Sequence, residues 1–171
     1  IEVIRGPAAA FWGANAVNGV INIITKPSAE TQGGLFSVTT GTNWKIRGLA
    51  RYGGRLSDAG HYRVYAKYAR HNAFRTPDGH AAEDDWRSRR TGFRADWNLD
   101  GEDHFELQGH LYEQDCGMRV TLPGNLLPVM QTNRVRRETS AGFLQGVWRR
   151  DFANADQLQL KLSCERADRE H

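Results

Sequence analysis

The chain has 171 residues, of which 39% are hydrophobic and 25% charged, enough for one domain of ordinary size. Lysine and arginine (23) nearly balance aspartate and glutamate (20), and because the two signs are interleaved, no nucleic-acid surface is indicated. No run approaches the roughly 18 apolar residues of a membrane helix, which excludes a helical membrane protein but leaves open a transmembrane β-barrel, whose strands alternate polar and apolar side chains.

Both ends of the chain fall close to strand-like segments. The first residue, Ile1, stands inside an apolar β-like segment, and His171 directly follows an alternating one. We therefore expect a piece of a longer protein. The two cysteines, Cys116 and Cys164, form neither a disulfide framework nor a metal-ligand spacing, and free thiols are expected.

Residues 1–32 differ in pattern from the rest of the chain. Short β-branched apolar segments at 1–5 and 20–26 predict two buried strands. Gly6-Pro7 ends the first of them, because proline has no N–H to donate to a ladder. Gly13 and Gly19 supply positions where a positive φ or a close backbone approach costs little. The unit reads as strand–turn–strand, followed by a polar linker.

From residue 33 the apolar residues recur with period two, which predicts consecutive β-strands. Seven strands are expected, at 35–41, 46–56, 61–71, 89–99, 104–114, 139–150 and 157–169. Tight turns are expected at 57–60, 100–103 and 153–156, and longer loops at 72–88 and 115–138, with 42–45 as a short exception. Short turns at one end and long loops at the other are typical of an up-and-down outer-membrane barrel.

The alternation also predicts two faces. An outward apolar row is expected from Tyr62, Val64, Ala66, Tyr68, Phe93, Ala95, Trp97, Leu158, Leu160 and Leu162, with Leu144 and Trp148 on the ambiguous strand 139–150. A hydrated row of mixed sign is expected from Arg47, Arg51, Arg55, Arg63, Lys67, Arg94, Asp96, Glu106, Lys161 and Glu165. In a barrel the first row faces lipid and the second the lumen; in a soluble sandwich the first row packs against a second sheet.

Several aromatic residues fall near the short-turn ends of their strands. They are Tyr62, Trp97, Phe105, Trp148 and Phe152. Such a row indicates an interfacial girdle; the alternative is ordinary aromatic packing at hairpin ends of a soluble sheet.

The stretch Ile1–Lys26 resembles the end of the plug domain of TonB-dependent outer-membrane receptors. The residues that carry the resemblance are Arg5-Gly6-Pro7, Gly13, Asn15-Ala16, Gly19-Val20-Ile21-Asn22 and Thr25-Lys26. It implies an all-β fold in which residues 1–32 are the C-terminal part of the plug with its linker, and residues 33–171 are about seven N-terminal strands of an antiparallel barrel. These strands would form an open, curved sheet in this piece, from a barrel class of about 22 strands.

The resemblance further implies a role in active uptake. In that family a plug closes the barrel, and the energised TonB complex of the inner membrane, pulling on an N-terminal box, rearranges it. A ferric siderophore is the expected ligand, with cobalamin or haem as alternatives. The implied location is the outer membrane of a Gram-negative bacterium, in contact with lipid and lipopolysaccharide; the alternative function is a soluble β-rich binding or adhesion module.

The plug motif supplies structural candidates. They are Glu2, Arg5, Gly6, Pro7, Gly13, Asn15 and Gly19. In the resembling family, arginines of the plug pair with glutamates of the barrel, which makes Arg5 a candidate lock residue that holds the plug in place. The alternative is that Arg5 pairs with Glu2 or with solvent; a surface ion pair contributes only about 0–1 kcal/mol to stability.

Candidate ligand contacts lie near the long loops. His71, Arg75 and His80 lie on or beside the 72–88 loop, with Asp84 and Asp85, in a spacing that fits no short metal motif. Two arginine groups stand at outer strand ends: Arg87, Arg89 and Arg90, and Arg134, Arg136 and Arg137. Arginine binds phosphate and carboxylate through a bidentate fork. There are three interpretations of these arginine groups: they bind lipopolysaccharide phosphates, they bind an anionic iron chelate, or they form a solvated basic rim.

No catalytic constellation is visible. The sequence has no nucleophile elbow, no phosphate loop and no interpretable carboxylate pair. We expect no enzyme activity and no cofactor.

Overall fold

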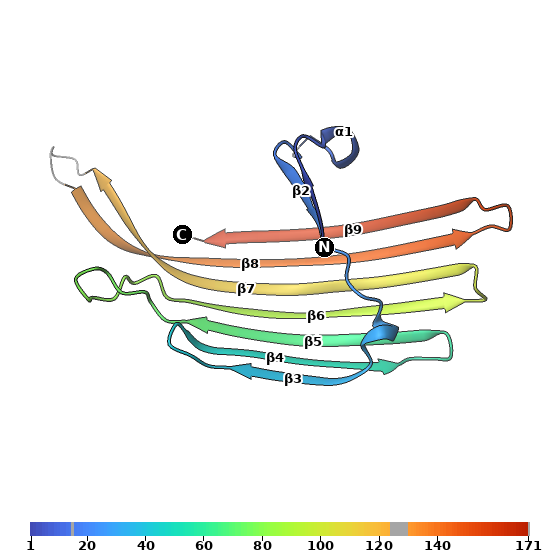
Figure 1. Cartoon of the computed structure of the whole chain (residues 1–171), viewed down its shortest axis with the longest axis horizontal. Helices are drawn as coiled ribbons and strands as arrows, with labels where there is room; N and C mark the ends of the chain where they lie inside the picture. The colour runs from blue at the N-terminus through green and yellow to red at the C-terminus, as the bar shows by residue number, and fades with distance from the viewer. Residues whose placement is uncertain (15, 124–129, 171) are drawn as a thin grey trace.

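The computed structural model of the chain describes residues 1–14, 16–123 and 130–170. It is all-β apart from two short helices: a two-stranded hairpin precedes a seven-stranded antiparallel sheet whose strands follow chain order (Figure 1). The elements are β1 (Glu2–Arg5), α1 (Ala9–Trp12), β2 (Gly19–Asn22), the 3₁₀ helix η1 (Ser28–Thr31), β3 (Gly33–Thr39), β4 (Trp44–Arg55), β5 (Gly60–His71), β6 (Trp86–Leu99), β7 (Asp103–Pro123), β8 (Met130–Asp151) and β9 (Gln157–Glu170).

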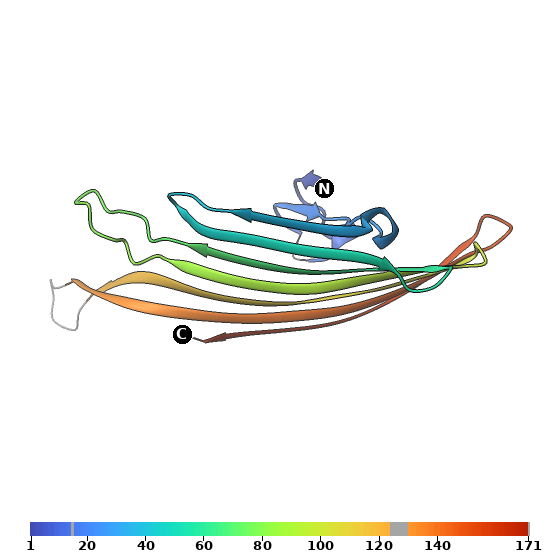
Figure 2. The same ribbon diagram turned by 90° about the horizontal axis from the view of Figure 1, so that it is seen from below.

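The expected up-and-down architecture is confirmed. Each strand from β3 to β9 pairs with its chain neighbours, and the sheet is open and curved (Figure 2). In the described part of the chain, neither helix has the length and apolar character needed to cross a membrane.

The long loop expected at 115–138 is wrong. The ladder between β7 and β8 continues without interruption from Asp115↔Glu138 to Pro123↔Met130, beyond the start of β6 at Trp86. Charged side chains at 115, 119, 134 and 136–138 hide the apolar period on which the expectation relied, whereas ladder hydrogen bonds join backbone groups and do not depend on side-chain polarity. The two strands form a finger that projects past the rest of the sheet (Figure 1).

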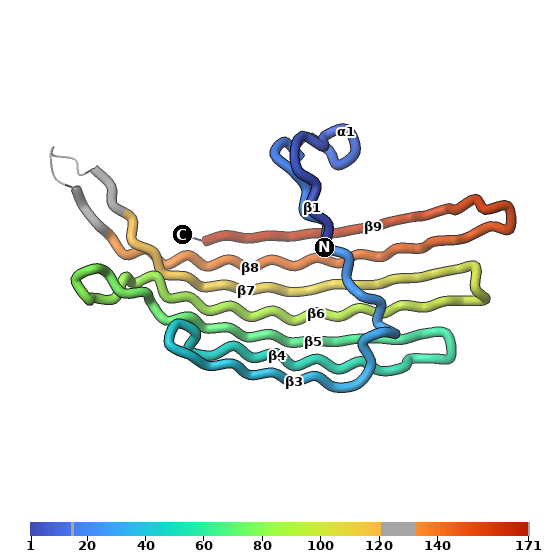
Figure 3. The backbone as a smooth tube through the Cα atoms, viewed as in Figure 1, coloured from blue at the N-terminus to red at the C-terminus, as the bar shows by residue number. Residues whose placement is uncertain are grey.

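The expectation that both N-terminal strands are buried is also wrong in this chain. β1 and β2 pair with each other, and their side chains remain largely exposed, with Val3 at 61% and Ile21 at 69%. The hairpin stands off the sheet, joined to it by the segment that leads to η1 (Figure 3). Apolar β-branched residues favour a strand locally, but burial requires a second surface, which the described sheet does not provide.

Gly19 shows why glycine recurs in this hairpin. Its φ is +152°, and a Cβ there would lie 2.7 Å from the Ile4 carbonyl oxygen. Gly6 and Gly13 also have positive φ, at +94° and +89°.

We expect Gly19→Val to destabilise the hairpin by about 1–3 kcal/mol, because the side chain meets backbone in a disfavoured conformation. The measurement is limited proteolysis of the purified full-length protein, with cleavage within residues 1–26 as the readout. Gly34→Val is the control, since nothing lies within 4 Å of its Cβ position. Equal protease resistance of the two variants would contradict the prediction.

Register assigns every side chain of the sheet to one of two faces, because cross-strand partners point the same way. The first face includes the row Tyr62↔Ala95↔Leu107↔Gly146↔Leu162. All residues expected to point outward share it, Leu144 and Trp148 included. We call it the apolar face. Its side chains have no second layer over them: Leu111 is 67% exposed and Leu162 68%.

The opposite face is polar and carries the linker. It includes the row Arg63↔Arg94↔Gln108↔Gln145↔Ser163 and all ten residues expected in the hydrated row. We call it the linker face, because η1 packs on β4, β5 and β6 there, with Ser28 fully buried.

The aromatic row is partly confirmed as a geometric feature. Trp97, Phe105 and Trp148 are direct cross-strand neighbours on the apolar face, and the rings of Phe105 and Trp148 stack at 6.3 Å. Its position at a membrane interface remains a prediction.

Candidate functional site

A groove of about 550 Å³ lies on the linker face at the end of the sheet that carries the 72–85 loop. Its walls combine cations and aromatic rings. The residues that matter for binding are Trp44, Arg47, Lys67, Trp86, Arg90 and Tyr112. We call this the basic aromatic groove.

The strands bring the three cations of the groove together. Arg47 comes from β4, Lys67 from β5 and Arg90 from β6, and alternation sends all three to the same face. Lys67 and Arg90 are direct cross-strand partners. Like charges placed directly opposite each other are destabilising. The pair creates a positive potential, and a bound anion would offset the repulsion between the two side chains.

Aromatic rings, rather than carboxylates, hold these cations. The guanidinium carbon of Arg90 lies 4.8 Å from the centre of the Tyr112 ring, and that of Arg47 lies 5.6 Å from the Trp44 ring. Lys67 Nζ lies 5.5 Å from the centre of the Tyr65 ring. Within the described residues, none of the three cations forms a salt bridge. Their charges are therefore available to a ligand.

An aromatic cluster closes one end of the groove. The rings of Trp44 and Trp86 meet edge to face at 5.4 Å, and His71 stacks on Trp86 at 5.7 Å. Phe74, from the 72–85 loop, covers His71 at 4.9 Å. Aromatic pairs of this kind add about 0.5–1.5 kcal/mol beyond their burial, and they fix the start of the loop against the sheet.

The residues predicted as ligand contacts fall in different places. His71 is only 7% exposed, and its Nδ1 donates to the Asn72 carbonyl oxygen at 2.6 Å, so its ring is packed at the groove's end. Arg75 donates to the Gly79 carbonyl oxygen within the loop, at 3.1 Å, and His80 accepts through its own carbonyl from Thr76. Of these three residues, the structure brings His71 next to the groove, and Arg90 of the first arginine group lines it.

Arg134 and Arg136 lie on the other side of the sheet. Register continues the apolar face through Gly117↔Arg136 and Arg119↔Arg134. Arg136 Nε donates to Asp115 at 2.6 Å, and Arg134 lies 3.5 Å from Asp85. Both guanidinium groups are therefore occupied by carboxylates away from the groove.

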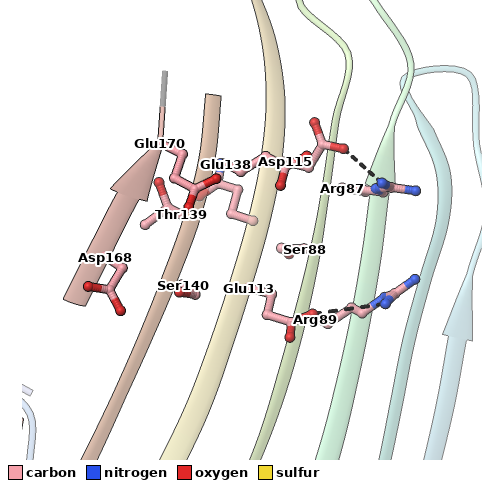
Figure 4. Close-up of a pocket in the computed structure, with 11 residues that line it drawn as sticks. Arg87, Ser88, Arg89, Glu113, Asp115, Glu138, Thr139, Ser140, Asp168 and Glu170 are labelled. Atoms are coloured by element: carbon pink, nitrogen blue, oxygen red, sulfur yellow. Dashed lines mark ion pairs between the residues drawn. The ribbon is translucent and has the colours of Figure 1, made fainter. Parts of the chain in front are cut away.

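Asp115 is the centre of this second cluster, which we call the rim patch. Its carboxylate pairs with both Arg136 and Arg87, and lies 2.8 Å from Arg87 Nη2. Figure 4 shows this pair of Arg87 with Asp115 and the pair of Arg89 with Glu113, whose charged atoms lie 3.9 Å apart. Asp115 lies beyond the apolar stretch of β7, which ends at Leu111. The hydrogen bond from Arg136 lowers the pKa of the Asp115 carboxyl below its usual value, with Arg87 acting in the same direction.

The loop between β5 and β6 is tied to the finger. Glu83 pairs with Arg119 at 3.2 Å, and the Gly117 N–H donates to the Asp85 carbonyl oxygen at 2.9 Å. A Cβ at Gly117 would lie 2.5 Å from the Glu83 carbonyl oxygen. Loop and finger thus pack as one unit at this end of the sheet.

The plug-motif residues form no binding site by themselves. Glu2 accepts a hydrogen bond from Asn22 at 2.8 Å, while Arg5 is exposed and, in the described residues, forms no ion pair. The Gly6 N–H donates to the Asn18 carbonyl oxygen, and Pro7 follows it. Asn15 lies outside the described residues. No three His, Cys, Asp or Glu side chains of the described residues gather to hold a metal ion.

Sequence reasoning missed three aromatic residues of the groove. Trp44 and Trp86 stand at strand starts that the expected boundaries of 46 and 89 excluded. Tyr112 was inside an expected strand, but its contact with Arg90 depends on register between β6 and β7. Strand alternation alone indicates one feature of the site: because Arg89 and Arg90 are adjacent in a strand, their side chains must point to opposite faces of the sheet.

Comparison with known proteins gives relatives over most of the chain. It is 32% identical over 195 residues to a ferric enterobactin receptor of Pseudomonas aeruginosa (91% of this chain, 24% of that protein). It is 30% identical over 173 residues to the ferric enterobactin receptor PirA of the same species (86% and 23%). A 43-residue stretch is 42% identical to the vitamin B12 transporter BtuB of Vibrio vulnificus (25% of this chain and 7% of that protein).

The chain therefore spans about a quarter of the length of the first two relatives, 24% and 23%. No protein-family model matches it, and no solved structure matches it.

Proposed function

From the similarity to the two ferric enterobactin receptors, we propose that this chain is part of a TonB-dependent receptor and that the full-length protein takes up a scarce ligand across the outer membrane. Homologous proteins are named as receptors and as a transporter. In this proposal the linker face lines the lumen, the apolar face meets lipid, and the TonB complex drives the movement of the plug. The proposed activity is transport, with no catalytic step.

The exposure of the apolar face supports the placement in a membrane. Leucines of β7 and β9 stand uncovered on it, with Leu111 and Leu162 more than half exposed. An apolar row of this length on a soluble protein would need a second sheet to cover it. Polar side chains and the linker share the opposite face, as the interior of a plugged barrel requires.

We propose an anionic ferric siderophore that carries aromatic rings as the ligand. The single observation that supports this most strongly is the pair Lys67 and Arg90, which lie directly opposite each other on the proposed lumen wall and have no carboxylate partner among the described residues. Trp44 and Tyr112 supply ring faces beside the cations. This chemistry favours a negatively charged aromatic chelate over a neutral sugar, and two relatives are named for ferric enterobactin.

The rim patch supports a second contact, with lipopolysaccharide. Arg87, Arg89 and Arg136 stand on the apolar face just beyond its last leucines. In a membrane this height corresponds to the phosphate groups of the outer leaflet, which arginine binds through two parallel hydrogen bonds. Arg87 uses Nη2 and Arg136 uses Nε to pair with Asp115, so other N–H groups of these half-exposed guanidinium groups are left for a phosphate.

The test uses the full-length protein in cells under iron limitation. Binding and uptake of a panel of radiolabelled ferric siderophores are measured with and without TonB. We expect saturable binding in both strains and uptake in the strain with TonB alone. Binding of cyanocobalamin or haem, with none of any ferric chelate, would move the proposal to those ligands. Absence of the protein from the outer-membrane fraction would replace it with a soluble binding or adhesion module.

A further inference from the structure

The segment between hairpin and sheet is held to the linker face by an unusual number of specific contacts. Ser28 is its most buried residue, with 0% of its surface exposed. Its backbone N–H donates to Asp96 Oδ2 at 2.7 Å, and its hydroxyl donates to the His61 carbonyl oxygen at 2.9 Å. A side chain of β6 and a backbone group of β5 thus bind one linker residue.

Two arginines extend this grip along the linker. Arg94 Nη1 donates to Thr25 Oγ1 at 2.8 Å, while the same guanidinium pairs with Asp96 at 2.7 Å and Glu106 at 3.0 Å. Arg63 Nη1 donates to the Lys26 carbonyl oxygen at 3.0 Å. Because Arg94 is fixed by two carboxylates, it presents its remaining N–H groups to the linker in one orientation.

Backbone also approaches backbone closely at the end of the segment. Arg63 reaches Thr31 Oγ1 at 3.2 Å, and a Cβ at Gly53 would lie 2.3 Å from the Thr31 carbonyl oxygen. Any side chain at position 53 would push η1 off the sheet. β3 then begins at Gly33, so the segment passes directly into the wall.

The preceding residues lack this attachment. Ile23 and Ile24 are 66% and 67% exposed, and β1 and β2 make no extensive contact with the sheet among the described residues. Thr25, three residues after β2 ends at Asn22, is hydrogen-bonded to the sheet through Arg94. Figure 3 shows the chain running from the hairpin onto the sheet.

We propose that Thr25–Gln32 is a permanent anchor, which stays docked on the barrel wall while the preceding plug moves during transport. The proposal rests on the proposed function, since it concerns how the lumen opens. It assigns Asp96, Arg94 and Arg63 as positioning residues that bind the anchor and not the ligand.

Thiol accessibility in the full-length protein tests this. Both variants are made with Cys116 and Cys164 replaced by serine, because these free thiols would also react. Ser28→Cys places a near-isosteric thiol in the buried position, and Ala29→Cys places one on the exposed neighbouring residue as the matched control. Cells are exposed to a fluorescent maleimide during uptake of a labelled ferric siderophore, with and without TonB. We expect the Ser28→Cys thiol to react at least tenfold more slowly than the Ala29→Cys thiol in both strains.

A TonB-dependent rise of tenfold or more in the labelling of Ser28→Cys would overturn the proposal, because the anchor would then leave the wall. A second variant keeps the test decisive if Ser28→Cys fails to assemble. It carries Thr25→Cys and Arg94→Cys together, and the two thiols are bridged by a thiol–thiol reagent about as long as an arginine side chain. Bridged receptor should take up ligand within about twofold of the same unbridged protein. Loss of uptake on bridging, with ligand binding retained, would equally contradict a permanent anchor. Absence of TonB-dependent uptake in the unmodified receptor would instead remove the proposed function.

Discussion

Arg90→Glu is expected to lower the affinity of the full-length receptor for its anionic ferric chelate by about 10–100-fold, because hydrogen bonds to charged groups contribute about 1.5–3 kcal/mol each and every 1.4 kcal/mol is tenfold in affinity. The substitution also places a carboxylate opposite Lys67, its cross-strand partner, which repels the anion and neutralises the charge of Lys67. Equilibrium binding of the radiolabelled chelate to purified receptor measures the effect.

The matched control is the neighbouring residue. Arg89→Glu makes the same change of charge one position away, on the apolar face, where Arg89 lies 3.9 Å from Glu113. We expect its affinity to remain within about twofold of the unmodified receptor. Equal losses in the two variants would assign the effect to overall charge and remove the basic aromatic groove as the binding site.

Leu162→Arg is expected to destabilise the folded protein in lipid bilayers by about 2–4 kcal/mol, the cost of an arginine near the middle of a lipid-facing strand. Leu162 is 68% exposed on the apolar face of β9. Denaturant unfolding of the full-length protein in vesicles provides the free energy of unfolding.

Ser163→Arg is the comparison, since Ser163 lies one residue further along and faces the linker side, opposite Gln145. Its expected change is below about 1 kcal/mol, because an arginine in a hydrated lumen keeps its solvation. If both variants unfolded alike, or if the protein folded without lipid, the apolar face would not be a membrane surface and the soluble module would be the better description.

Two kinds of feature followed from local pattern. Strict alternation, as in Leu158, Leu160 and Leu162, placed strands and faces correctly, because side chains in a strand must point to opposite sides. The glycine-rich N-terminal motif predicted a hairpin whose glycines have positive φ, since other residues rarely adopt that conformation.

The finger and the groove required information that local pattern does not contain. The β7–β8 ladder past Asp115 carries charges on both faces, so its sequence resembles a polar loop although its backbone pairs fully. The groove joins Trp44, Lys67 and Tyr112 from three strands, and its existence depends on the register between them. Register is a property of paired backbones and cannot be counted along one strand.

By itself the sequence determined the all-β class, the order and parity of the strands, and the family resemblance of residues 1–26. These depend on the chemistry of near neighbours in the chain. Only the tertiary structure decided the partners of Arg89 and Arg90 on the two faces of the sheet, and the packing of His71. It also decided that Lys67 has no carboxylate partner among the described residues, and that Ser28 is hydrogen-bonded to Asp96. Each of these is a contact between residues far apart in the chain, fixed by strand register and by the path of the linker across the sheet.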